Sequence, residues 1–158
     1  PDKIYWHDLI GYNYRMTNLQ ASIGYGQMEK ADKIIETKIE NAKLFKLLLK
    51  NTPGLTFVKE FEGIKNTFWL VTIIIDEEKF GCDRNTVKDF LKENNIDSRP
   101  VFYPIHQMPP YQKYTHGEFK NSNYASKNGL SLPSSFSLSS KEIKRICDCL
   151  IDIYNKVN

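Results

Sequence analysis

The sequence predicts an α+β fold, in which a small, mainly antiparallel three-stranded sheet packs against helices and is preceded by a long helix. A helical pattern of apolar residues fills most of residues 17–52. Two β-rich segments then follow one another with only a turn between them, and helical patterns surround one further β-rich segment. Because strands joined by a short turn pair antiparallel, this order is typical of a sheet that carries its helices packed on it.

The first helix begins at Thr17, whose hydroxyl can cap a backbone N–H while the Gln20 side chain reaches back. It ends near residues 51–54, where a proline–glycine pair opposes continuation. At about 1.5 Å per residue, its length approaches ~50 Å. Gly24 and Gly26 are the expected points of a bend. Its apolar positions, spaced by three, four or seven residues, are Met28, Ala31, Ile35, Ala42, Phe45 and Leu49.

The strands are predicted from their β-branched and aromatic residues. Residues 55–61 alternate well enough for a half-buried strand, and residues 63–67 form the turn after it. Residues 68–75 are a continuous apolar run, which is typical of a central strand covered on both faces. Residues 96–102 form the third strand and lead into a proline-rich loop.

Three further helices complete the prediction. Asp83 caps a short helix that ends near residues 94–95. Another short helix covers residues 122–128, and Ser139 with Glu142 forms a capping box that opens the last helix. The apolar residues that the first and last of these helices turn inward are Val87, Phe90, Leu91, Ile143, Ile146, Cys147, Leu150 and Tyr154.

Composition limits the classes of function. The chain has 158 residues, enough for one domain with a core, and its 41% hydrophobic and 26% charged residues are ordinary for a globular protein. The net charge of +3 is small and the lysines are spread along helices, so we expect no nucleic-acid binding. There is no apolar run of about 18 residues, so we expect no membrane-spanning helix.

The chain has the character of an internal piece. It begins at Pro1 without a methionine or a leader, and its opening, with Trp6 and Ile10, resembles the middle of a folded protein. The long helix also exceeds the length that the predicted sheet can cover. We therefore expect a fragment whose helix packs on a missing domain or on a second subunit.

Cysteine and histidine patterns predict neither a disulfide framework nor a metal site. Three cysteines leave one unpaired, and Cys147 and Cys149 lie two apart on a helix, on different faces. We interpret them as small apolar residues in a reducing compartment, the cytoplasm. His7, His106 and His116 are too scattered for a metal site. The sequence also lacks a glycine-rich phosphate loop and a nucleophile elbow.

Asn13 and Arg15 form the first candidate binding pair. In an extended segment their side chains would point the same way, so that an amide donor and a planar cation face one phosphate or carboxylate. In the structural alternative, Asn13 bonds to the backbone and Arg15 pairs with an acid. The chemistry of the two residues favours neither interpretation.

A second candidate cluster lies in residues 99–106. Prolines stiffen this segment and remove backbone donors, so it can hold Arg99, Tyr103 and His106 in fixed positions for binding. The alternative is a structural connection that buries an aromatic side chain, and the residues by themselves favour that alternative slightly.

Several motifs occur in a familiar order across nearly the whole chain. They are residues 11–17 (GYNYRMT), 19–24 (LQASIG), Gln27, Glu29, 97–100 (DSRP), 103–106 (YPIH), Pro109, Tyr111 and 129–134 (GLSLPS). In these segments the chain resembles the C-terminal part of the DegT/DnrJ/EryC1/StrS sugar aminotransferases, pyridoxal-phosphate enzymes of fold type I. The resemblance implies the small C-terminal α+β domain of that fold.

The resemblance also implies the chemistry of the intact enzyme. Such enzymes transfer an amino group, usually from glutamate, to a keto-sugar attached to a nucleotide, and a lysine holds the pyridoxal 5'-phosphate. That lysine would lie upstream of Pro1, and Lys3 is a poor substitute for it. We therefore expect no catalytic residue in this chain, no activity and no retained cofactor when it is alone.

The site residues that the resemblance implies lie at a dimer interface. Asn13 would contact the phosphate of a cofactor held mainly by the partner subunit of a homodimer. Tyr12 and Arg15 would lie beside it, and Arg99, Tyr103 and His106 would lie near the nucleotide-sugar pocket.

The same resemblance suggests boundaries within the chain. Residues 1–16 would be a segment of the large domain and active-site loop, residues 17–52 a connecting helix, and residues 53–158 the small domain. Two alternatives stay open. The chain could be a stand-alone α+β module that binds a small anion, or it could come from a non-catalytic, regulatory member of the family.

Overall fold

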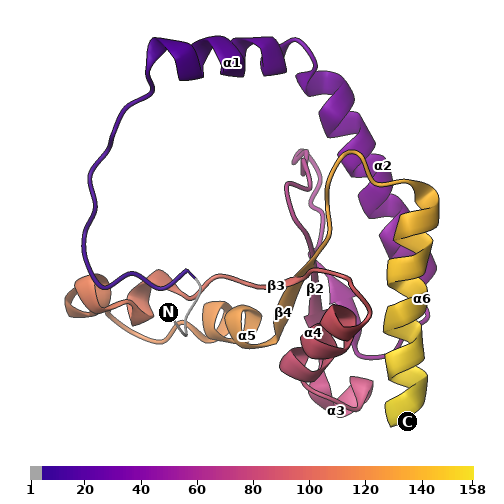
Figure 1. The fold of residues 1–158 in the computed structure, drawn as a ribbon. Helices are drawn as coiled ribbons and strands as arrows, with labels where there is room; N and C mark the ends of the chain where they lie inside the picture. The colour runs from indigo at the N-terminus through magenta and orange to yellow at the C-terminus, as the bar shows by residue number, and fades with distance from the viewer. Residues whose placement is uncertain (1–4) are drawn as a thin grey trace.

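The computed structural model describes residues 5–158. Pro1 and Lys3, on which the expectations of a fragment and of a substitute lysine fall, lie outside the described residues. Figure 1 shows a body of sheet and helices on one side and a wide arc of chain on the other. We call residues 9–28, which carry most of that arc, the arch. The body is the sheet together with helices α2 (Ala31–Leu49), α4 (Arg84–Glu93) and α6 (Ser140–Val157).

The sheet has four strands, all antiparallel to their neighbours, in the order β1-β2-β4-β3. Their bounds are β1 Leu55–Phe57, β2 Val71–Ile75, β3 Arg99–Pro100 and β4 Gly129–Leu132. The α+β class is therefore confirmed, but the prediction of three strands is wrong. The missed strand, β4, lies inside the sheet between β2 and β3.

All four residues of β4 are buried, whereas β2 alternates between buried and half-buried residues. The prediction of a central strand within residues 68–75 is confirmed, because β2 lies between β1 and β4, but the strand fully covered on both faces is β4. Gly129 shows how tightly β4 is covered, because a Cβ atom there would lie 2.4 Å from the carbonyl oxygen of Ala125. Only glycine allows so close an approach.

The observed strands are shorter than their predicted ranges. Phe68 has a positive φ of 47°, so the chain enters the sheet only after it, and β2 begins at Val71. Pro100 has no N–H to donate, which limits β3 to two residues at the edge of the sheet.

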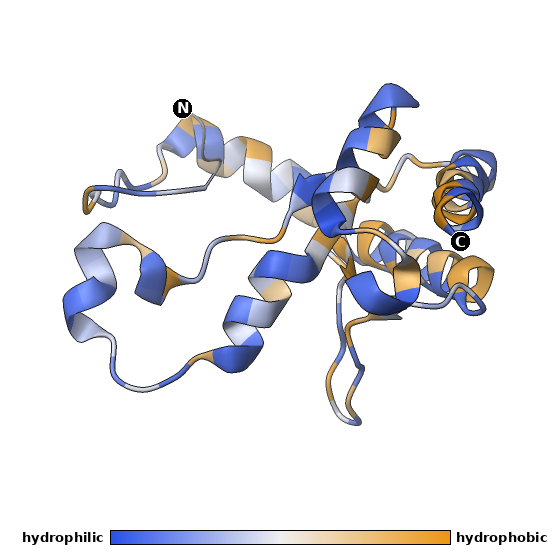
Figure 2. Ribbon diagram, turned by 90° about the horizontal axis from the view of Figure 1, so that it is seen from below, coloured by the Kyte–Doolittle hydropathy of each residue, from blue (hydrophilic) through white to orange (hydrophobic). Residues whose placement is uncertain are grey.

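The core lies between the sheet and the helices. Helix α2 (Ala31–Leu49) packs against α6 (Ser140–Val157), and α4 (Arg84–Glu93) packs against α6 and β4. In Figure 2 the hydrophobic residues gather where these helices meet the sheet. The largest fully buried side chains include Phe45, Leu49, Ile73, Ile75, Phe80, Leu91, Leu130, Ile143 and Leu150.

Three of the predicted helix starts are confirmed by their capping hydrogen bonds. Thr17 and Ser139 both form complete capping boxes, with Gln20 and Glu142 respectively. The Asp83 carboxylate accepts a hydrogen bond from the N–H of Thr86 at 2.8 Å. A short helix that the sequence did not predict, α3 (Glu77–Phe80), precedes α4.

The prediction of a single long helix over residues 17–52 is wrong in one respect, because the structure has two helices there. Helix α1 spans Asn18–Met28, and α2 starts at Ala31 after a break at Glu29 and Lys30. Lys30 has φ −110° and ψ 2°, and its N–H bonds to the carbonyl of Gln27, three residues back. That interrupts the helical hydrogen-bond ladder, while the expected bend points, Gly24 and Gly26, remain helical.

Helix α1 buries none of its residues. Figure 1 shows it at the top of the arch, away from the sheet. The expectation that part of the first helix finds nothing to pack on within the chain therefore holds for α1. No helix in the described part of the chain combines the length and the apolar character needed to cross a membrane.

The segment between β3 and β4 completes the fold. It contains two 3-10 helices, η1 (Ile105–Gln107) and η2 (Pro109–Tyr114), and then helix α5 (Lys120–Asn128). The start of α5 lies two residues before its predicted position.

Candidate functional site

Asn13 forms a local turn at the start of the arch. Its side-chain oxygen accepts a hydrogen bond from the N–H of Arg15 at 2.8 Å, which is an Asx turn. The sequence argument assumed an extended segment here. Arg15 instead adopts a left-handed φ of 39°, so the segment is not extended at that residue. The part of the structural alternative that gives Asn13 a backbone partner is therefore present. The ion pair that it gives Arg15 is absent among residues 5–158.

The Asx turn leaves a donor set that suits a phosphate. It engages the carbonyl oxygen of the Asn13 amide and leaves the NH₂ group without a hydrogen bond to the described residues. The guanidinium of Arg15 is exposed two residues on. Amide and guanidinium N–H groups are both donors without acceptor capacity, and phosphate oxygens accept from them. The residues present thus fit the phosphate of pyridoxal 5'-phosphate.

Tyr12 lies beside this turn with its side chain in solvent, at 85% exposure. The side chain of Tyr14 is likewise in solvent, at 89% exposure. Phenol rings this exposed bury almost none of their apolar surface within the chain, so they have surface to offer a ligand or another protein.

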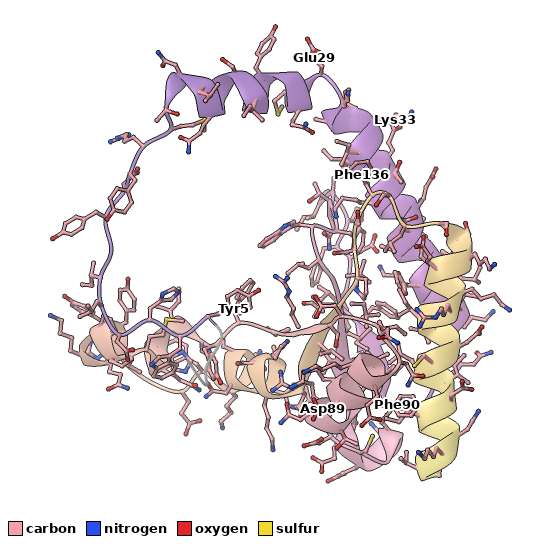
Figure 3. All side chains as sticks on the ribbon, in the orientation of Figure 1. Tyr5, Glu29, Lys33, Asp89, Phe90 and Phe136 are labelled. Carbon is pink, nitrogen blue, oxygen red and sulfur yellow. The ribbon has the colours of Figure 1, made fainter. Side chains whose placement is uncertain are left out.

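The second cluster is built around the end of β3 and includes residues of the N-terminal segment. The Nη1 atom of Arg99 donates to the Tyr5 hydroxyl at 3.2 Å, and this hydrogen bond raises the pKa of Arg99. The Tyr5 ring meets Phe102 edge-on at 4.6 Å between centroids. Figure 3 shows Tyr5 lying over the chain that follows β3. Trp6 makes a similar edge contact with Tyr103, at 5.3 Å.

His106 lies in the same segment after β3, and its contacts hold that segment together. Its Nε2 atom lies 2.9 Å from Oδ1 of Asn123, and its ring stacks on Phe119 at 4.3 Å. Its backbone carbonyl accepts a hydrogen bond from Thr115. These contacts tie η1 to α5, which favours the structural alternative at His106.

The two predicted groups of site residues are not brought together within this chain. No hydrogen bond, ion pair or ring contact in the described structure joins residues 12–15 to Arg99, Tyr103 or His106. Figure 1 shows the arch rising away from the segment that carries η1 and η2.

The sequence argument missed Tyr5 and Trp6, and it missed Arg84, which lines one cavity together with Tyr5 and Tyr103. Arg84 donates from Nη1 to the Gly129 carbonyl at 3.3 Å, and burial lowers the pKa of its guanidinium. In the sequence, the position of Arg84 directly after the capping residue Asp83 indicates the start of a helix and does not indicate a binding role. The aromatic opening of the chain could have indicated Tyr5 and Trp6, but nothing in sequence spacing connects them to residues more than ninety positions later.

The described cysteines and acids are not arranged as a metal site. Burial raises the pKa of the Cys147 thiol to about 12, so it stays protonated. Within residues 5–158, no three side chains of His, Cys, Asp or Glu gather in a metal-binding group.

Comparison with known proteins assigns the chain to a family. The model of the DegT/DnrJ/EryC1/StrS aminotransferase family matches residues 1–151. A GDP-perosamine synthase of Vibrio cholerae is 42% identical over 154 residues, which cover 97% of this chain and 41% of that protein. The chain therefore spans well under half of the length of this relative.

Solved structures agree in fold. The chain superposes on S. venezuelae DesV with a TM-score of 0.81 at 19% identity, covering 100% of this chain and 42% of that one. It also matches the E. coli GDP-4-keto-6-deoxy-D-mannose-3-dehydratase, solved with bound hydrated PLP, with a TM-score of 0.76 at 25% identity over 90% of this chain and 37% of that one. Because the family model covers nearly its whole length, this chain belongs to the DegT/DnrJ/EryC1/StrS aminotransferase family.

Proposed function

We propose that this chain is the C-terminal part of a pyridoxal-phosphate-dependent aminotransferase that transfers an amino group from glutamate to a nucleotide-linked keto-sugar. The observation that carries the proposal is the family match over residues 1–151 together with the 42% identity to a GDP-perosamine synthase. The name of the E. coli structural relative, a GDP-linked keto-sugar enzyme with bound PLP, supports both the cofactor and the substrate class.

Asn13 is the residue of this chain that we assign to the cofactor. When bound, pyridoxal 5'-phosphate supplies an electron sink for the transfer of the amino group. The Asx turn engages the side-chain oxygen of Asn13, so its NH₂ group would be the donor to the cofactor phosphate. Arg15 and Tyr12, both exposed beside this turn, would contact the substrate.

The assembly that we propose is a homodimer with shared active sites in the cytoplasm. The arch supports it, because Ile23, Tyr25 and Met28 on α1 are at least 62% exposed. Apolar residues exposed in such number indicate a surface that a second subunit, or a part of the protein outside this chain, covers. Arg99, Tyr103 and His106 then form one wall of the nucleotide-sugar pocket, with His106 holding the wall in place.

The test uses the full-length protein loaded with pyridoxal 5'-phosphate. It is incubated with ¹⁵N-glutamate and GDP-4-keto-6-deoxy-D-mannose, and the sugar is analysed by mass spectrometry. We expect the sugar oxygen of the keto group to be replaced by labelled nitrogen. Loss of water from the sugar without a gain of nitrogen would contradict the proposal and indicate dehydratase chemistry.

Two substitutions test the role of Asn13. Asn13→Asp keeps the acceptor of the Asx turn but replaces the NH₂ donor by a negative charge, so cofactor affinity should fall at least about tenfold. Asn121→Ala, an exposed amide on α5, is the control and should leave affinity unchanged. Equal cofactor affinity in Asn13→Asp and the parent protein, measured by equilibrium dialysis, would contradict the assignment.

A further inference from the structure

A basic cavity beside α4 shares Tyr103 with the wall of the proposed nucleotide-sugar pocket, but its charged residues, Arg84 and Lys88, have no role in the proposed aminotransfer. It has a volume of about 270 Å³, and its polar lining comes from Tyr5, Arg84, Asn85, Lys88, Tyr103 and Ser126. A water molecule occupies about 30 Å³ of liquid, so the cavity holds several of them or a small polar ligand. Four separate parts of the chain form its walls: the N-terminal segment, α4, the connection after β3, and α5.

Arg84 is the most unusual group in this cavity. Its Nη1 atom is bonded to the Gly129 carbonyl, but its Nε atom is buried and has no hydrogen-bond partner among the described residues. Buried polar atoms of folded proteins nearly always have a partner, which can be an ion or a bound molecule. Arginine remains protonated in proteins, so the missing partner is an acceptor, and an anion suits it best.

The charges around the cavity agree with an anionic ligand. Lys88 adds a second positive charge, and no carboxylate lines the cavity. Asp83 is engaged with the N–H and hydroxyl groups of Thr86 at the start of α4. Asp89 lies 3.2 Å from the Lys88 amine and is largely exposed, so this ion pair contributes little and can open. In Figure 3, Asp89 lies on the lower side of α4, away from Tyr5.

Hydroxyl groups supply the remaining donors. Tyr5 already accepts a hydrogen bond from Arg99, which leaves its own O–H free to donate. Tyr103 and Ser126 carry two further hydroxyls on the lining. Three hydroxyls and two cations around one small space match the oxygens of a phosphate, which accept from several directions at once.

We propose that this cavity binds the phosphate or diphosphate group of a small molecule through Arg84, Lys88 and the surrounding hydroxyls. The inference does not depend on the proposed aminotransfer, because it is carried by the buried Nε of Arg84 and the charge of Lys88, and that proposal uses neither residue. It gives the buried Nε of Arg84 an acceptor and explains why a phenol from the start of the chain closes a pocket on α4.

Calorimetric titration of the full-length protein, saturated with pyridoxal 5'-phosphate, tests the proposal at constant ionic strength. The ligands are inorganic phosphate, pyrophosphate and GDP, and sodium chloride is the control. We expect Lys88→Gln to weaken pyrophosphate binding about tenfold, because one charge-assisted contact is lost. Lys92→Gln removes the same charge one turn later on α4, outside the cavity lining, and should have no effect.

Further variants separate this site from the cofactor site and from a folding defect. Asn13→Asp should leave pyrophosphate binding intact while cofactor affinity falls. Arg84→Lys keeps a positive charge and should lower the affinity with circular dichroism unchanged. Tighter binding of GDP than of pyrophosphate would identify the phosphates as those of a nucleotide, and equal binding would identify a free phosphate. Absence of pyrophosphate binding, or the same affinity in Lys88→Gln and Lys92→Gln, would overturn the proposal.

Discussion

The body buries its large apolar side chains, whereas the arch exposes them to solvent. In the body, Phe45, Ile73 and Leu150 are fully buried between helices and sheet. In the arch, Leu19, Ile23 and Met28 are between 62% and 74% exposed although they lie on a well-capped helix. A good helix start therefore does not imply a packed helix, because capping satisfies the backbone and burial requires a partner surface. The body holds its own core, whereas the arch needs a surface that this chain does not provide.

The largest effect that the comparison predicts is in the body. Phe45→Ala removes a fully buried ring and leaves a cavity, so the free energy of unfolding should fall by about 3–5 kcal/mol. Urea denaturation followed by circular dichroism measures this. A loss below ~1 kcal/mol would mean that the core of the body is loosely packed.

Capping residues provide the next and smaller contrast. Ser139→Ala should cost about 1 kcal/mol of global stability, because α6 is part of the core. Thr17→Ala removes an equivalent capping box from α1 and should leave the global transition unchanged, since α1 buries nothing. Hydrogen exchange should show faster exchange in α1 alone. If Thr17→Ala and Ser139→Ala lowered the free energy of unfolding equally in urea denaturation, the arch and the body would not differ in how they contribute to stability.

Acid should weaken the body slightly through Asp83. The backbone hydrogen bond from Thr86 lowers the pKa of Asp83 below its ordinary value of 3.8. A carboxyl whose folded-state pKa is depressed contributes stability above its unfolded pKa and loses it as the pH falls through the folded value. Asp83→Asn keeps a capping oxygen without titrating, so its stability should decline less between pH 5 and pH 3 than that of the parent protein. Parallel declines would exclude this contribution.

The smallest effect on stability should come from the apolar face of the arch. Ile23→Ala should change the free energy of unfolding by less than ~0.5 kcal/mol, because the side chain is 62% exposed. Self-association of the 158-residue chain, measured by light scattering, should nevertheless decrease. An unfolding cost like that of Phe45→Ala would show that the arch packs on the body.

Local chemistry determined much of this molecule in advance. Both capping boxes, the Asp83 cap and the inward stripe of α6 follow from residues a few positions apart, and the structure confirms them. The family could likewise be recognised from short motifs kept in order. These features can be predicted from a sequence because the helical pattern repeats every 3.6 residues and a capping box joins residues only three positions apart.

Only the tertiary structure decided the interior strand, the break and the cavity. The sequence assigns Gly129–Leu132 to no helix or strand, because four residues are too few to show a period, and its two neighbours in the sheet make it a strand. The break at Lys30 carries no proline or glycine, so its sequence contains no signal. Arg84 meets Tyr5 and Tyr103 around one cavity because folding brings distant segments together, and no local pattern encodes such a meeting.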